Sequence, residues 1–277
     1  MTPELIASLQ EAFDRGETVA LVTIVAARGS TPQRVGARML VHADGRTVGT
    51  IGGGCYESDA FGRAREALRT RTTALVHYDL NDDIAEETGL ICGGHMDVFI
   101  EALEPPPALF IVGAGHVGHQ LGRLAPTVGF DVHVLDDRAR FANAERFPGA
   151  HVYVDDVGDW LSRRDLPPSA YVVVVTRGHR HDFDALRAIA GRELRYVGVI
   201  GSRAKIARLV DLLIGEGVPA EWLRGVHAPI GLDIGAVTPE EIAVAILAEL
   251  VAVRRGRSAQ HTDLPSLRWT APALREG

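Results

Sequence analysis

The glycine pattern G-x-G-x-x-G at Gly113–Gly118 constrains the fold of this 277-residue chain more than any other feature. It follows the apolar run Leu109–Val112 and leads into a segment with helical spacing. In such a strand-loop-helix unit, the first glycine permits a tight turn, the second lets the backbone approach a pyrophosphate, and the third packs helix on strand. We therefore predict a phosphate-binding loop that uses Gly113, Gly115 and Gly118.

Apolar strands alternate with helical segments throughout the C-terminal part of the chain. Four valines in a row, Val172–Val175, are typical of a central strand buried on both faces. Alternation of this kind predicts a doubly wound, Rossmann-type parallel sheet with strand order 3-2-1-4-5. The expected strands are Ala108–Gly113, Val132–Asp136, Val152–Val154, Tyr171–Thr176 and Tyr196–Gly201, and the expected helices are Val117–Thr127, Phe183–Ala190, Arg203–Ile214 and Pro239–Val253.

A proline run, Glu104-Pro105-Pro106-Pro107, separates this region from the N-terminal part of the chain. Consecutive prolines favour a stiff extended linker, so we expect an N-terminal domain of residues 1–104 and a C-terminal domain of residues 105–277. The N-terminal domain is expected to be α+β or α/β, with its topology open. Its expected elements are a helix at Pro3–Arg15, strands at Val19–Ala26, Ala37–His42, Arg46–Ile51, Thr73–Tyr78 and His95–Ala102, and a helix that Gly52–Gly54 opens and that runs to about Arg69.

Composition excludes several classes of protein. The net charge of −7 argues against a nucleic-acid binder, because neutralising phosphates requires a dominant basic face. The acidic N-terminus does not resemble a signal peptide, and no apolar run approaches the ~20 residues of a membrane span. The two cysteines, Cys55 and Cys92, are expected to be reduced thiols. We therefore expect a cytoplasmic protein with no membrane or nucleic-acid partner.

Histidines and a carboxylate follow the strands that border the expected crevice. The loops after the first and fourth strands flank the topological switch point of such a sheet, so His116 is expected to face His179, His181 and Asp182. Such a group could bind metal, shuttle protons or hold a phosphorylated ligand. The alternative is that these residues cap helices and line an anion loop around a dinucleotide, with Asp182 as an N-cap.

Three further features suit a nucleotide. Asp136 ends the second strand, where its carboxylate is suited to a ribose diol, although nearby Arg138 weakens a preference for NAD over NADP. Ser202, Arg203 and Lys205 stand at an expected helix start, which suits a phosphate. For Lys205 alone, a solvated helix entry is an equal alternative.

Two loops of the N-terminal domain also carry chemistry. Arg28 and Arg34 flank turn formers and hydroxyls, a composition that suits an anion. Cys55 follows three glycines, Gly52, Gly53 and Gly54, and is expected at a helix N-terminus. The helix dipole and free amides there favour a thiolate. A thiolate suits a soft metal or sulfur transfer, although a lone cysteine is often a small buried hydrophobe. For Cys92 a tight turn with a buried thiol is favoured.

The chain contains a series of longer motifs: GSTPQRVGARM (Gly29–Met39), IGGGCYE (Ile51–Glu57), CGG (Cys92–Gly94), GAGHVG (Gly113–Gly118), TRGHRHD (Thr176–Asp182), IGSRAK (Ile200–Lys205) and PIGLDIGAVTPEEIA (Pro229–Ala243). Together these motifs resemble the XdhC/CoxI family of xanthine dehydrogenase accessory proteins. The resemblance covers nearly the whole chain, and the combination and order of its motifs are more specific than G-x-G-x-x-G alone. Tyr56 departs from the smaller aliphatic residue expected beside the cysteine.

The resemblance implies a chaperone that binds molybdenum cofactor (molybdopterin) and assists its sulfuration and insertion. The implied partners are a cysteine desulfurase and xanthine dehydrogenase or a related molybdenum hydroxylase, and we expect a homo-oligomer. Carried over to this sequence, the resemblance makes Cys55 and the Gly52–Gly54 loop candidate cofactor contacts, with Cys55 near the molybdenum. The alternative is an NAD(P)-dependent oxidoreductase with His179 or His181 as its acid/base.

Overall fold

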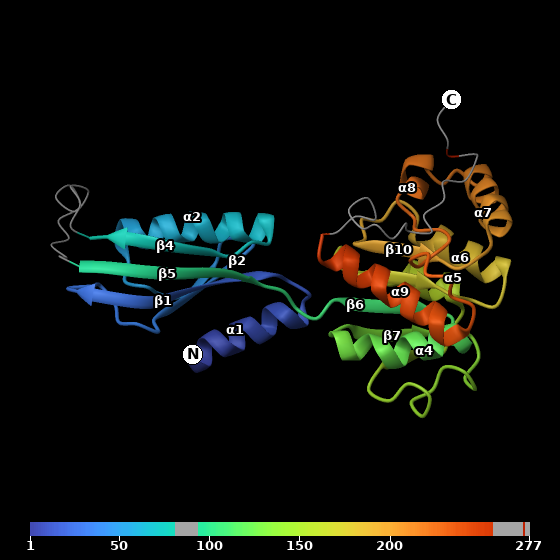
Figure 1. Cartoon of the computed structure of the whole chain (residues 1–277), viewed down its shortest axis with the longest axis horizontal. Helices are drawn as coiled ribbons and strands as arrows, with labels where there is room; N and C mark the ends of the chain where they lie inside the picture. The colour runs from blue at the N-terminus through green and yellow to red at the C-terminus, as the bar shows by residue number, and fades with distance from the viewer. Residues whose placement is uncertain (81–93, 257–273, 275–277) are drawn as a thin grey trace. The chain divides into compact units, whose positions relative to one another are not determined.

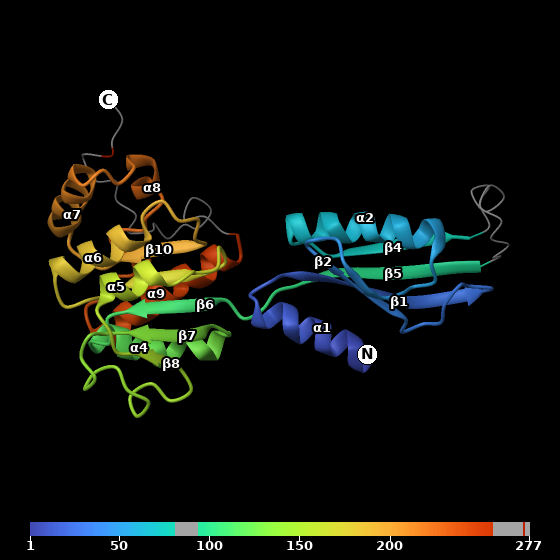
Figure 2. The same cartoon turned by 180° about the vertical axis from the view of Figure 1, so that it is seen from behind.

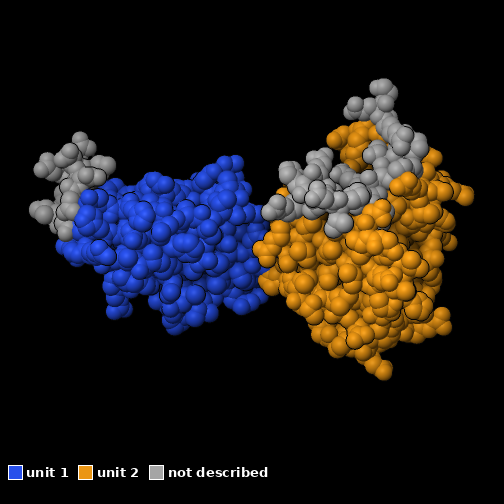
Figure 3. Space-filling view, in the orientation of Figure 1, with its two compact units in different colours: residues 1–105 blue, residues 106–277 orange. Residues whose placement is uncertain are grey.

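The computed structural model of the chain describes residues 1–80, 94–256 and 274. These residues form two compact units, Met1–Pro105 and Pro106–Gly277, called unit 1 and unit 2 below (Figure 3). Each unit has its own sheet and its own apolar core. No helix within the described ranges is long and apolar enough to cross a membrane.

Unit 1 is an antiparallel α+β domain, which resolves the class that the sequence left open. Its five strands have the order β3-β2-β1-β5-β4, and each pair of neighbours is antiparallel. The expected hairpin forms at residues 43–46, where Gly45 adopts a φ of 90°. The elements are α1 (Pro3–Asp14), β1 (Val19–Gly29), β2 (Arg38–His42), β3 (Thr47–Gly49), α2 (Gly54–Thr70), β4 (Ala74–Asp79) and β5 (Gly94–Leu103).

Alternation along the strands of unit 1 separates two apolar layers. Ala20, Val22 and Ile24 of β1 point to one face and pack with the buried alanines of α2, which lies along the sheet (Figure 1). Val19 and Leu21 point to the opposite face, where they pack with Leu5 and Ala12 of α1. The period of two in a strand therefore lets one sheet bury apolar side chains against both helices.

Unit 2 is the expected Rossmann-type domain. Its parallel sheet has the order β10-β9-β6-β7-β8, which is the predicted 3-2-1-4-5 order. Its elements are β6 (Ala108–Val112), α4 (His116–Leu124), a 3-10 turn η1 (Ala125–Val128), β7 (Asp131–Leu135), β8 (His151–Tyr153), α5 (Val157–Arg163), β9 (Tyr171–Val174), α6 (His179–Ile189), β10 (Tyr196–Val199), α7 (Arg203–Gly215), α8 (Ala220–Arg224) and α9 (Pro239–Arg254).

Helices cover both faces of this sheet (Figures 1 and 2). On one face, α5, α6 and α7 pack over Val172 and Val174 of the central strand β9. On the other, α4 and α9 pack over Leu109 and Ile111 of β6. Helix α9 begins with the expected capping box, in which the Thr238 hydroxyl accepts from the Glu241 amide.

Three helical predictions were wrong or incomplete. Helix α6 begins at His179, not at Phe183, so the expected loop of histidines is the first turn of a helix. Helices α5 and α8 were not predicted, and α8 has only five residues. The remaining predicted helices of unit 2 differ from the observed ones by a few residues at their ends.

Candidate functional site

The glycine loop of unit 2 joins β6 to α4, and its three glycines meet different surroundings. At Gly113, φ is 112° and a Cβ would lie 2.5 Å from the carbonyl oxygen of Val175. At Gly118, a Cβ would overlap the carbonyl oxygen of Gly113. At Gly115, the N-cap of α4, a Cβ would meet no heavy atom within 4 Å. Packing thus explains why Gly113 and Gly118 must be glycine. It does not explain why position 115 is glycine.

Asp136 follows β7 and turns its carboxylate back to this loop. Its side chain is buried, and Oδ2 accepts from the Ala114 amide at 2.8 Å. The Arg138 side chain donates to the same carboxylate from Nε at 2.8 Å and from Nη2 at 2.9 Å. The Arg138 amide also donates to it, at 3.1 Å. These four donors match the roughly four acceptor positions of a carboxylate. A ribose diol at Asp136 therefore requires Arg138 to move.

The same contacts set the charge of Asp136. Burial raises its pKa, but the hydrogen bonds from Arg138 and the Ala114 amide outweigh burial, so that the pKa lies below its ordinary value. The carboxylate therefore stays charged near neutral pH. The charge holds the glycine loop to the end of β7.

A largely buried ion pair lies beyond the carboxyl ends of β9 and β10 and joins α6 to α7. Asp182 is fully buried, and Lys205 of α7 places Nζ 2.6 Å from its Oδ2. Thr176, just after β9, donates its hydroxyl to Asp182 Oδ1 at 2.6 Å. The Lys205 ammonium also donates to the Ile200 carbonyl at 3.1 Å. This ion pair and its hydrogen bonds link β9, β10, α6 and α7 beside the glycine loop.

Two sequence interpretations change as a result. Asp182 is not an N-cap, since Gly178 occupies that position and caps α6 without a side chain. Lys205 is not a solvated helix entry, because its ammonium is directed to Asp182. Ser202 does cap α7, where its hydroxyl accepts from the Lys205 amide at 3.3 Å.

The expected cluster of histidines does not gather as a metal site. His116 and His179 are exposed at the first positions of α4 and α6, and His181 is half-buried. Within the described ranges, these histidines and Asp182 belong to no set of three metal-type ligand atoms lying close together. Arg203 is also exposed.

An ion pair that the sequence did not reveal links the loops on either side of the glycine loop. Arg177, after β9, places Nη2 2.8 Å from Oδ2 of Asp137, after β7. Strand β6 lies between those two strands. The strand order alone brings these residues together, so the pair could have been proposed from the charges after each strand.

The glycine loop of unit 1 places Cys55 in the first turn of α2. Cys55 is a free, half-buried thiol, and it is the one cysteine in the described part of the chain. Gly52 has a φ of 127°, and a Cβ there would lie 2.5 Å from Cβ of Pro32. The segment after β1 that holds Pro32 and Arg34 therefore packs directly on the Gly52–Gly54 loop, whereas Arg28, expected in the same loop, lies within β1.

Glu57, which sequence reasoning missed, occupies the amides of this loop. Its Oε2 accepts from Ile51 at 2.8 Å and from Gly53 at 3.1 Å, and also from the Thr50 hydroxyl. Burial raises the pKa of Glu57, but these hydrogen bonds outweigh burial and lower it. The expectation of free amides around Cys55 is therefore wrong for Ile51 and Gly53. An acidic residue in the first turn was the available signal.

Arg28 and Arg34 both have exposed side chains, so either can meet an anion from solvent. Arg28 pairs in register with His95 near the start of β5. Gly94 is the neighbouring residue, and a Cβ there would lie 2.5 Å from the Arg28 carbonyl oxygen. The expectation for Cys92 falls outside the described residues.

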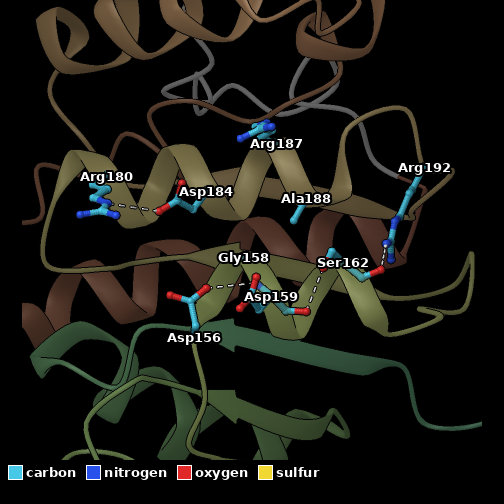
Figure 4. Close-up of a pocket in the computed structure, with 9 residues that line it drawn as sticks. All are labelled: Asp156, Gly158, Asp159, Ser162, Arg180, Asp184, Arg187, Ala188 and Arg192. Atoms are coloured by element: carbon cyan, nitrogen blue, oxygen red, sulfur yellow. Dashed lines mark hydrogen bonds and ion pairs between the residues drawn. The ribbon is translucent and has the colours of Figure 1, made fainter.

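A groove of about 670 Å³ lies elsewhere on unit 2, between α5 and α6 (Figure 4). Its lining carries three aspartates and three arginines, and some of these groups have partners within the groove. Arg180 faces Asp184 at 3.9 Å, and Arg192 donates to the Ser162 carbonyl at 3.2 Å. None of the sequence-predicted site residues lines it. The lining residues are Asp156, Gly158, Asp159, Ser162, Arg180, Asp184, Arg187, Ala188 and Arg192.

Comparison with known proteins agrees with this architecture. Residues 109–250 match the XdhC Rossmann domain, and residues 12–79 match the XdhC and CoxI family. The chain is 37% identical over 237 residues to "Uncharacterized protein YqeB" of Escherichia coli (strain K12), covering 85% of this chain and 43% of that protein. The chain therefore spans less than half the length of this relative.

Two more distant relatives match over most of their own length. A probable xanthine dehydrogenase subunit of Bacillus subtilis (strain 168) is 27% identical, with 86% of this chain and 94% of that protein covered. "Molybdenum cofactor insertion chaperone PaoD" of Escherichia coli (strain K12) is 22% identical, with 88% of this chain and 86% of that protein covered. Together with the two domain matches, the folds and motifs above lead to one conclusion: the chain belongs to the XdhC/CoxI family.

Proposed function

We propose that this protein binds molybdenum cofactor, presents it for sulfuration by a cysteine desulfurase, and delivers it to xanthine dehydrogenase or a related molybdenum hydroxylase. The observation that carries the proposal is the open space at Gly115. Gly113 and Gly118 are required by packing, whereas nothing in the described fold excludes a side chain at Gly115. A bare backbone at a helix N-terminus suits the close approach of a phosphate.

The residues of each unit, taken by itself, fit one chemical group of this cofactor. Molybdopterin carries a phosphate, sometimes extended to a dinucleotide, at one end and a dithiolene-bound molybdenum at the other. In unit 2, the Gly113–Gly118 loop is suited to a phosphate. In unit 1, Cys55, a free and partly accessible thiol, is the soft donor suited to molybdenum. Arg28 and Arg34, both exposed, would add positive charge for an anionic ligand.

Sequence similarity to known proteins supports the same proposal. The two domain matches place the chain in the XdhC/CoxI family, and one relative is named as a molybdenum cofactor insertion chaperone. Another relative is named as a probable xanthine dehydrogenase subunit. We extend both associations to this chain as part of the proposal. Its residues would bind and orient the cofactor.

The direct test measures pterin and molybdenum in the purified full chain. We expect fluorescent oxidised pterin on release from the parent, and lower pterin and client activation for Cys55→Ser and for Gly115→Val. Cys92→Ser is the matched thiol control and should lose much less. Equal pterin, molybdenum and client activation in the parent and in Cys55→Ser would show that the thiol assignment is wrong. Arg28 and Arg34 would then be the better candidates for contact with the cofactor.

A nicotinamide-dependent oxidoreductase is the competing function, favoured by the same open Gly115. It needs a ribose at Asp136, where Arg138 already occupies the carboxylate. Titration with NAD, NADP and cytidine nucleotides separates the two functions. We expect a phosphate-bearing nucleotide to bind at Gly113–Gly118, and binding of none at millimolar concentration would contradict a nucleotide-type loop. Binding of NAD or NADP with catalysed hydride transfer would favour the oxidoreductase.

A further inference from the structure

A compact group of metal-type ligands lies on the edge of the unit 2 sheet, away from every site residue named above. Asp131 begins β7, His133 stands two residues later, and His151 begins the edge strand β8. One ligand atom from each of the three side chains lies within 4.8 Å of those of the other two. Among the described residues, this is the set that combines two imidazoles with a carboxylate at such spacing.

Asp131 links the two histidines. His133 Nε2 lies 3.1 Å from Asp131 Oδ2, and His151 Nε2 lies 3.4 Å from Asp131 Oδ1. His133 and His151 are paired in register across the two parallel strands. The register therefore fixes which side chains meet, and the period of two places Asp131 and His133 on the same face of β7.

The His133 ring is held in a single orientation. Its Nδ1 lies 3.2 Å from the Tyr153 hydroxyl, and its face stacks on Phe110 with ring centroids 4.5 Å apart. Its side chain is only 15% exposed. A metal-binding histidine commonly donates its second ring N–H to an outer partner, which fixes the tautomer. Tyr153 is such a partner, and it leaves Nε2 directed to Asp131.

We propose that Asp131, His133 and His151 bind a divalent transition-metal ion, with zinc as the ion best suited to the site. Two imidazole nitrogens and one carboxylate form a donor set that zinc uses in proteins, with water completing a tetrahedron. Ligands at about 2.0–2.2 Å from a tetrahedral ion lie about 3.3–3.6 Å from one another. The distances from Asp131 to His133 (3.1 Å) and to His151 (3.4 Å) are close to that spacing, and they run to the two different oxygens of the carboxylate.

One side chain must turn to complete the site. The two imidazole rings are nearly parallel, 16° apart, and parallel rings cannot both direct an in-plane lone pair to one ion. His151 is 57% exposed and has room to rotate, while His133 stays fixed. Binding is therefore an adjustment of one surface side chain around a preformed pair.

The consequence of binding would be structural. Strand β8 has three residues and is reached through a long segment after β7, so few ladder bonds hold it to the sheet. The ion would fasten β8 to β7. The site begins at Asp131, the first residue of β7, whereas Asp136 and the glycine loop lie past the other end of that strand. Metal binding is thus independent of the proposed cofactor function.

The test uses the full chain after treatment with a chelator. Zinc titration by calorimetry and the visible spectrum of bound cobalt report affinity and coordination. We expect one ion per chain, a tetrahedral cobalt spectrum, and an increase of several degrees in the Tm with zinc. His151→Ala and Asp131→Asn change exposed or half-exposed groups and should weaken binding at least tenfold.

His77→Ala is the matched control. His77 is exposed on β4 and places Nδ1 2.8 Å from Asp97 Oδ1, so the substitution removes a similar histidine-carboxylate pair without a third close ligand. This control should bind zinc like the parent. A parent that binds no zinc, or zinc affinity unchanged in both His151→Ala and Asp131→Asn, would overturn the proposal.

Discussion

The two glycine-rich loops lead into helices, yet the chain holds them in opposite ways. In unit 1, the amides of Ile51 and Gly53 at the Gly52–Gly54 loop donate to Glu57, a residue of the helix that follows the loop. In unit 2, the Ala114 amide of the Gly113–Gly118 loop donates to Asp136, the residue that follows the neighbouring strand β7. The first arrangement is local in sequence, and the second depends on the assembled sheet.

The comparison also shows that glycines in one motif serve different purposes. Gly52 and Gly118 lie where a Cβ would strike Pro32 and the Gly113 carbonyl, respectively. Gly53 and Gly115 face open space. Substitutions at the first pair should therefore test the fold. Substitutions at Gly53 and Gly115 should instead test backbone conformation or ligand access. The two loops can therefore be compared by substituting one glycine of each kind in each loop.

The largest effect is expected for Gly118→Ala. The added methyl would meet the Gly113 carbonyl oxygen, so either the loop or α4 must shift. We expect unit 2 to lose about 3 kcal/mol or more of its free energy of unfolding. Gly115→Ala, at an open helix N-cap, should lose no more than about 1 kcal/mol. Urea denaturation followed by a unit 2 probe such as Trp160 fluorescence measures both, and similar losses would contradict the division.

A smaller effect is expected for Gly52→Ala in unit 1. Its Cβ would meet Pro32, and its φ of 127° is unfavourable for alanine. We expect a loss of about 2–3 kcal/mol from strain and overpacking. Gly53→Ala, with a φ of 75°, a ψ of −175° and open space, should lose about 1–2 kcal/mol from backbone strain alone. Thermal unfolding of unit 1 compares the pair, and a greater loss for Gly53→Ala would reverse the assignment.

The smallest effect is expected for Glu57→Gln, and it should depend on pH. Because the folded-state pKa of Glu57 is lowered, its stabilisation is present above the unfolded-state pKa of about 4.3 and is lost as pH falls through the folded value. At pH 7 the variant should lose on the order of 1 kcal/mol, typical of charged hydrogen bonds at a partly exposed site. Urea midpoints measured down to pH 3 should converge with those of the parent, and a constant difference would indicate lost packing instead.

Local patterns predicted much of unit 2. Val172–Val175 identified the central strand, and Thr238, Pro239 and Glu241 identified the start of α9, because each signal lies within a few residues. Helix α6 was placed too late because Gly178 caps it without a side-chain signal. Helix α5 was missed because its seven residues are too few to show a clear apolar period.

For the candidate site, the sequence could not predict which side chains distant in the chain would become partners. Lys205 looked available for a phosphate because the sequence could not show that Asp182 would lie 2.6 Å from its ammonium. Asp136 was proposed from the sequence as a ribose-binding carboxylate at the end of the second strand, but its pairing with Arg138 depends on side-chain orientation. The His133–His151 contact required the β7–β8 register, which one strand pattern alone does not provide.

The packing of α9 has a consequence for synthesis of the protein on the ribosome. Unit 1 draws all its described elements from the first 105 residues, so it can close early. In unit 2, Ile246 and Leu250 of α9 cover the apolar face shared by β6 and α4, which are made long before. At about 5–20 residues per second, synthesis from the end of α4 to Ile246 takes roughly 6–24 s, and that face stays uncovered during this time. Nascent unit 2 should therefore be the part of the chain that most needs protection from aggregation during translation.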